Sequence, residues 1–180
     1  MPPGYEVTAD PNEVARAVLS KSTWAVLALT CHVEIFTQVH FKSSIGPQED
    51  LSPLWKDVFL FHWKEESQHA VLDELEWRRI DAELSDEERD AAVTDLIDLV
   101  MAVDGILQAQ AGADAEYFLA NAGTEFSDDE KTAIRALMRD AYRWQHIVSG
   151  VRDGRFVGIL DELTNDAQMT RVSEALAPLM

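Results

Sequence analysis

The sequence has little of what marks several large classes of protein. Its 180 residues include a single cysteine, Cys31, which excludes an intramolecular disulfide and favours a reducing compartment. The N-terminus lacks the basic and then apolar pattern of a signal peptide, and every apolar run is too short to span a bilayer. These absences predict a cytoplasmic protein with no membrane partner.

Basic residues are also scarce. The chain has 15 Lys and Arg against 33 Asp and Glu, which gives a formal net charge of −18. Such a charge repels phosphate backbones, so nucleic acid is not expected as a partner. Hydrophobic residues make up 47% of the sequence, which excludes general disorder. The length and the absence of a linker predict one domain over residues 1–180.

Strand alternation is nearly absent, and helix signals dominate. Asp10–Pro11 and Ser52–Pro53 are each typical of a cap followed by proline at the first helical position, and Ser85 begins a capping box with Glu88. Ser127, followed by three acidic residues suited to the positive end of the helix dipole, marks a further helix start. These signals predict an all-α fold. The expected helices run over residues 11–43 with a break near 20–23, then 53–82, 85–121 and 127–151, followed by a C-terminal helical segment at 156–163 and 166–176.

The second long helix carries an unusual polar row. Residues three or four apart on a helix share a face, so His62, Glu66, His69 and Asp73 lie side by side. A single Glu-x-x-His spacing also occurs on solvated faces. Here, however, the flanking residues are apolar on nearly every side, which predicts a buried helix whose carboxylates and imidazoles need partners. A metal ion would satisfy them.

The first long helix contributes one carboxylate to a mostly apolar stripe. Glu34 shares its face with Leu27, Cys31 and Phe41. Such a residue could extend its carboxylate to solvent or form an ion pair with an arginine. Cys31, one turn from Glu34, would face the same site and be open to oxidation.

Four long helices, a core glutamate on the first and Glu-x-x-His on the second resemble the ferritin-like diiron-carboxylate superfamily. Glu34 precedes Glu66 by 32 positions, which is similar to the usual separation in that family. The resemblance covers about residues 24–151 and implies a ferritin-like antiparallel four-helix bundle. It is nearest in layout to the small diiron oxygenases, and it implies Glu34, Glu66 and His69 as metal ligands, with His62 as an additional histidine.

The second half of the chain departs from the family pattern. The fourth helix has no Glu-x-x-His, because Arg143 precedes His146 where the glutamate would stand. Asp114, 32 positions before His146, stands where the third helix would supply glutamate. Asp114 and His146 are therefore the expected ligands of this half, with Gln145 and Asp140 as alternatives. Arg143 could instead replace the second metal by pairing with Glu66 or Asp114.

The resemblance implies a diiron oxidase or oxygenase. Carboxylate and imidazole ligands suit iron, with two Fe per chain expected, or manganese. O₂ would then be the second partner and a small apolar compound the substrate. The alternatives are an iron-storage or metal-handling protein, and a metal-free helical scaffold. The apolar content of the helices is compatible with a homodimer.

Overall fold

The computed structural model describes residues 3–180, which form helices and no strand. The fold is therefore all-α, as the sequence predicts. The helices, in chain order, are α1 (Pro11–Leu19), α2 (Thr23–His40), α3 (Pro53–Asp81), α4 (Asp86–Asn121), α5 (Asp128–Arg143), α6 (Ser149–Val151), α7 (Gly154–Leu163) and α8 (Asp166–Leu176). Two π turns, η1 (Phe41–Ile45) and η2 (Trp144–Val148), continue α2 and α5, and a 3₁₀ turn, η3 (Ala177–Leu179), closes the chain.

The predicted helix ends agree closely with the observed ones. Ser85 and Ser127 form complete capping boxes with Glu88 and Glu130, so each cap satisfies backbone donors that the first helical turn leaves free. Gly123 follows the last turn of α4 with φ +70°, the left-handed conformation that favours glycine after a helix. Among the described residues, no helix is both long enough and apolar enough to cross a membrane.

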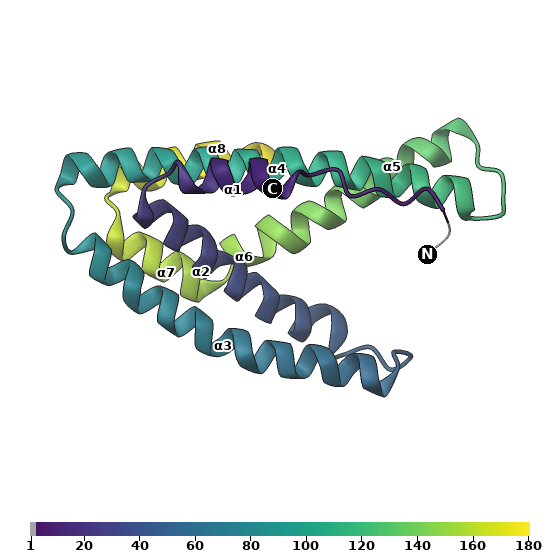
Figure 1. Cartoon of the computed structure of the whole chain (residues 1–180), viewed down its shortest axis with the longest axis horizontal. Helices are drawn as coiled ribbons and strands as arrows, with labels where there is room; N and C mark the ends of the chain where they lie inside the picture. The colour runs from purple at the N-terminus through teal and green to yellow at the C-terminus, as the bar shows by residue number, and fades with distance from the viewer. Residues whose placement is uncertain (1–2) are drawn as a thin grey trace.

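The long helices form two hairpins that diverge from one another. Figure 1 shows α2 lying between α3 and α4, with α3 and α5 far apart at the open end of the molecule. Helix α2 packs along α3 and, over part of its length, against α4, whereas α5 packs on α4. The arrangement differs from a closed bundle of α2, α3, α4 and α5.

The buried core lies at the end where the hairpins meet. It joins residues of α2, α3, α4, α7 and α8, and none of its members comes from α5. Helix α5 buries none of its residues, whereas α7 buries Phe156, Ile159, Leu160 and Leu163. The C-terminal segment therefore supplies the part of the core that the predicted four-helix bundle would take from α5. The physical reason is composition: α5 carries few large apolar residues, and Leu137 is among its exposed ones.

A buried polar link fixes α2 against α3 inside this core. The Trp24 indole packs edge-on against Trp77, with ring centroids 5.1 Å apart, and its Nε1 donates to Asp81 Oδ1 over 2.8 Å. Arg89 pairs with the same carboxylate at 2.7 Å, which compensates its buried charge. Because these contacts set how α2 lies along α3, they also determine which residues face each other further along the hairpin.

Candidate metal centre

Glu66 is the middle of a three-residue polar row on α3. His62, one turn before it, approaches Glu66 Oε1 with Nε2 at 2.6 Å, and His69, one turn after it, approaches Glu66 Oε2 with Nδ1 at 2.7 Å. Each carboxylate oxygen therefore has its own imidazole. The periodicity of an α-helix is sufficient to bring these three residues together, as the sequence analysis predicts. Asp73, the fourth residue of the predicted row, is not in the group of possible metal ligands that the described residues form.

Glu34 joins the row from α2. One ligand atom each of Glu34, Glu66 and His69 lies within 4.8 Å of the other two, close enough for a single ion to contact all three. Among the described residues these are the ones that form such a group. The sequence prediction that Glu34 and the Glu-x-x-His pair come together is thus matched by the geometry of the α2–α3 hairpin. His62 contacts Glu66 but is outside this group of three, and the other predicted ligands, Asp114 and His146, lie elsewhere.

The two carboxyl groups of this cluster differ in their affinity for protons. Partial burial, together with the hydrogen bond and the charge of Glu66, raises the pKa of Glu34 to about 8. The hydrogen bonds from Glu34 and then His69 lower the pKa of Glu66, and the contact with Glu66 raises the pKa of His69. Two carboxyl groups held this close cannot both ionise without cost unless a cation lies between them. The cluster therefore favours a proton or a metal ion.

The cluster is open to solvent on one side. The imidazoles of His62 and His69 are each 47% exposed, whereas Glu66 is 15% exposed. A hydrated ion can therefore reach the carboxylates directly, without passing through the interior. This openness differs from the buried helix that the apolar composition of α3 predicts.

The structure places Asp114 and His146 apart from this cluster. Asp114 accepts hydrogen bonds from Gln110 Nε2 at 2.7 Å and from the Tyr142 hydroxyl, and His146 packs edge-on against Phe36 with centroids 5.3 Å apart. The π turn η2 contains His146 and alters the α-helical register on which the spacing argument relied. In this chain, the second half of the expected ligand set is not assembled.

The residues considered as substitutes are also engaged elsewhere. Asp140 pairs with its neighbour Arg139 at 3.0 Å, and Gln145 lies beside His40, whose pKa it raises against the effect of burial. Arg143 binds Asp104, with Nε 2.7 Å from Oδ1. The alternative prediction, that Arg143 pairs with Glu66 or Asp114, is therefore wrong. Gln108, one turn further along α4, also donates to Asp104, over 2.6 Å.

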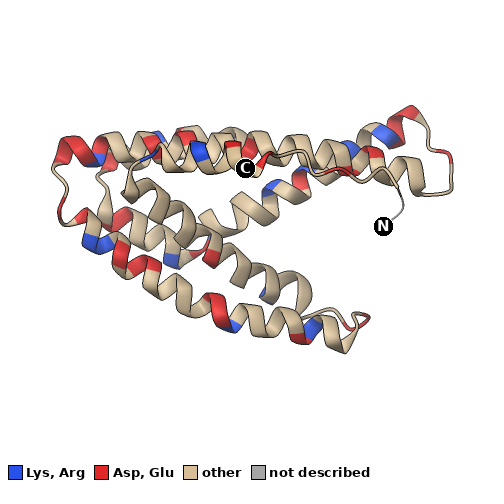
Figure 2. Cartoon of the chain, in the orientation of Figure 1, with Lys and Arg blue, Asp and Glu red and all other residues tan. Residues whose placement is uncertain are grey.

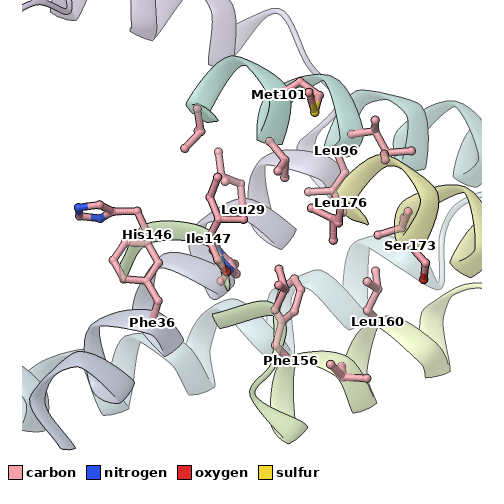
Figure 3. Close-up of a pocket in the computed structure, with 18 of the residues that line it drawn as sticks. Leu29, Phe36, Leu96, Met101, His146, Ile147, Phe156, Leu160, Ser173 and Leu176 are labelled. Carbon is pink, nitrogen blue, oxygen red and sulfur yellow. The ribbon is translucent and has the colours of Figure 1, made fainter. Parts of the chain in front are cut away.

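An apolar pocket of about 380 Å³ lies on the other side of α2. Figure 3 shows Leu29, Phe36, His146, Phe156, Leu160 and Leu176 around it. His32 and Phe36 stand two residues before and after Glu34, which places them on nearly the opposite side of the helix. Burial lowers the pKa of His32 to about 4, and its Nε2 lies 3.0 Å from the Ile147 carbonyl oxygen. The pocket and the cluster of Glu34, Glu66 and His69 are therefore separate features.

Cys31 does not face the carboxylate cluster as an accessible thiol. Its side chain is fully buried in the core cluster, and burial raises its pKa to about 12. The expectation that it is open to oxidation is contradicted by this burial, because the reactive form of cysteine is the exposed thiolate.

Acidic residues do not concentrate around the cluster. Figure 2 shows Asp and Glu along the whole molecule, including both ends of the long helices. The net charge therefore identifies no site by itself, and the candidate centre depends on the specific geometry of two carboxylates and an imidazole. Comparison with protein-family models, with curated proteins and with solved structures finds no match for this chain.

Proposed function

We propose that this protein binds Fe(II) at Glu34, Glu66 and His69 and oxidises it with O₂. The observation that carries the proposal is that ligand atoms of these three residues lie within 4.8 Å of one another. Carboxylate oxygens and imidazole nitrogens are ligands that suit Fe(II) and Mn(II), with water completing the coordination. His62 stands one turn before Glu66 and orients the carboxylate through its 2.6 Å contact.

The position of the cluster favours iron itself as the substrate. An oxygenase would hold an apolar compound beside its metal, but the large apolar pocket lies on the opposite side of α2 from Glu34. The cluster instead opens to solvent through the half-exposed imidazoles of His62 and His69. Iron can thus arrive from and leave to solution, as metal handling requires.

The proposed reaction balances with O₂ as the oxidant. Two Fe(II) ions each lose one electron, and one O₂ accepts both electrons with two protons to give H₂O₂. The carboxylates of Glu34 and Glu66 stabilise Fe(III) more strongly than Fe(II), because their negative charge interacts more favourably with the higher charge. The protein's part is thus to bind the ion with hard, anionic ligands on an open face.

Iron binding and oxidation test the proposal directly. The protein is incubated anaerobically with Fe(II) and freed of excess metal, its iron content is measured, and Fe(III) and H₂O₂ are followed after exposure to O₂. Glu66→Gln and His69→Ala are expected to weaken Fe(II) binding by at least about tenfold, because each removes a ligand. Glu87→Gln, at an exposed position in the first turn of α4, and His40→Ala are the controls and should keep wild-type binding. Wild-type protein without bound iron, or Glu66→Gln with unchanged affinity, would exclude the proposed site.

A further inference from the structure

Helix α3 presents an apolar face that no other part of the described chain covers. Six of its large apolar side chains are between 52% and 74% exposed: Leu54, Trp55, Val58, Phe61, Leu72 and Leu75. Isolated exposed apolar residues are common on protein surfaces, but two groups of them on one helix, Leu54–Phe61 and Leu72–Leu75, mark an interaction surface on either side of the polar row. The sequence predicts a buried helix from these residues, and within one chain the structure buries only Ala70, Trp77 and Asp81 of α3.

This apolar face adjoins the candidate metal ligands. Val58, His62, Glu65, His69 and Leu72 follow one another at alternating spacings of four and three residues, the repeat of a helix that packs along another helix. The imidazoles thus lie in the middle of the seam, and apolar residues lie toward its ends. A second helix seated on this seam would bring a second set of ligands to the open side of Glu66.

The ligand set on this face is half of the set that a two-metal helix bundle uses. Such bundles take a Glu from each of two helices and a Glu-x-x-His pair from each of two others. The α2–α3 hairpin supplies Glu34 together with Glu66 and His69, and the α4–α5 hairpin uses Asp104, Asp114 and Arg143 in contacts of its own. The missing set has the same composition as the set already present. A second copy of the same hairpin contains it.

We infer that two copies of this chain pack through the α2–α3 hairpins, so that Glu34, Glu66 and His69 of both copies form one two-metal centre at the dimer interface. The inference rests on the proposed metal function and specifies the partner that completes the site. A two-fold axis that passes near Glu66 and is perpendicular to α3 makes the two α3 helices antiparallel. The seam of one copy then faces the same seam of the other. The resulting four helices, two from each chain, contribute two Glu residues and two Glu-x-x-His pairs.

Charge and area agree with this arrangement. Two copies bring four carboxylates together, and their four negative charges are neutralised by two divalent cations, so metal binding favours association. The six exposed apolar side chains present on the order of 100 Å² each, or about 600 Å² per copy, which approaches the roughly 800 Å² per partner of a standard interface. Burial of the apolar side chains favours association of the two copies, and the cations neutralise the repulsion between the carboxylates at the centre of the interface.

The test compares assembly and metal binding in matched variants, with Mn(II) as the probe. Phe61→Gln/Leu72→Gln removes apolar area from the face without adding charge beside the ligands. Phe118→Gln/Leu137→Gln makes the same chemical change at exposed positions of α4 and α5. Sedimentation with and without Mn(II) measures the mass, and equilibrium dialysis measures the affinity and stoichiometry of Mn(II) binding. Electron paramagnetic resonance shows whether the bound Mn(II) ions are magnetically coupled. Circular dichroism confirms that each variant is folded.

The expected wild-type result is a dimer with two Mn(II) ions that couple magnetically, because they share one centre. The face variant should be monomeric and bind Mn(II) at least tenfold more weakly, and the control variant should match the wild type. A wild type that binds Mn(II) as a monomer, with the spectrum of isolated ions, would overturn the inference and assign the face to a different protein. A face variant that keeps wild-type affinity would also overturn it. Absence of any Mn(II) or Fe(II) binding by the wild type would instead remove the proposed function.

Discussion

Arg143 at the end of α5 is bound to Asp104 in the middle of α4 by two parallel hydrogen bonds. Nε donates to Oδ1 over 2.7 Å and Nη2 donates to Oδ2 over 2.9 Å. Asp104 is only 3% exposed, and Gln108 also donates to it. The guanidinium holds the pKa of Asp104 below its usual range. This pair fastens α5 to α4, a helix pair that otherwise has little buried apolar area to hold it.

Replacing Arg143 by methionine should destabilise the protein. Arg143→Met leaves the Asp104 carboxylate buried without its charged partner, which typically costs about 3 kcal/mol of unfolding free energy. Urea denaturation at neutral pH measures the change. Arg139→Met is the control, because Arg139 makes an exposed ion pair with Asp140 and should cost less than about 1 kcal/mol. Equal losses in the two variants would show that the Asp104 pair is not worth more than a surface contact.

Reversing the charge at Arg143 should leave the metal content unchanged. If Arg143 stood in for a second metal, Arg143→Glu would raise the stoichiometry from about one to about two ions per chain. The structure pairs Arg143 with Asp104 instead, so the variant should be less stable but bind the same amount of Mn(II) per folded chain. Equilibrium dialysis checks this outcome on protein shown to be folded. A doubled stoichiometry would place Arg143 at the metal centre after all.

The sequence predicts local features of this fold much better than it predicts helix assembly. The capping box at Ser85, the helix start at Ser127 and the stop at Gly123 depend on neighbouring residues alone, so they can be predicted from the sequence. The Glu66–His69 pair follows from helical periodicity for the same reason. Glu34 reaches them because a hairpin of two long helices brings together residues at similar distances from the connecting loop.

The part that could not be predicted depends on tertiary contacts. A π turn at Trp144–Val148 changes the register of His146, and no residue pattern in the sequence marks it. The choice of Asp104 as the partner of Arg143 joins residues on two different helices whose relative position is set by packing. The sequence shows that α3 is rich in apolar residues, but composition alone does not determine whether the same chain or another molecule covers these side chains.

Gly150 lies against the ring of His32, and a methyl group there should be destabilising. An added Cβ would lie 2.5 Å from His32 Nε2 and 2.6 Å from Cδ2, so the ring must shift. His32 is held between Phe36 and Phe156, which leaves it little freedom. Gly150→Ala should therefore lower the unfolding free energy by about 1–3 kcal/mol in urea denaturation.

The control for this prediction is a helical glycine with free space around it. An added Cβ at Gly158 of α7 meets nothing within 4 Å. Gly158→Ala should raise the unfolding free energy by up to about 1 kcal/mol, because alanine has less conformational entropy to lose than glycine. Stabilisation by both substitutions would contradict the close approach of Gly150 to His32.

Cys31 should be unreactive for as long as the protein is folded. Burial raises the pKa of its thiol to about 12, against an ordinary value of 9.0, and the side chain has no solvent exposure. The thiolate is the nucleophile, so three units of pKa reduce its population at pH 8 by roughly a thousandfold, before access is considered. Ellman's reagent should therefore label the folded protein at least roughly a thousandfold more slowly than the protein in urea. The raised pKa also makes the free energy of unfolding depend on pH. Above pH 9 the thiol ionises in the unfolded chain before it does so in the folded chain, so a rise in pH toward 12 favours unfolding.

The reactive control for the labelling experiment is Cys31→Ala/Leu19→Cys, which moves the thiol to an exposed position at the end of α1. If Cys31 in the folded protein reacted as fast as this control, the core around α2 would have to open far more readily than its packing indicates.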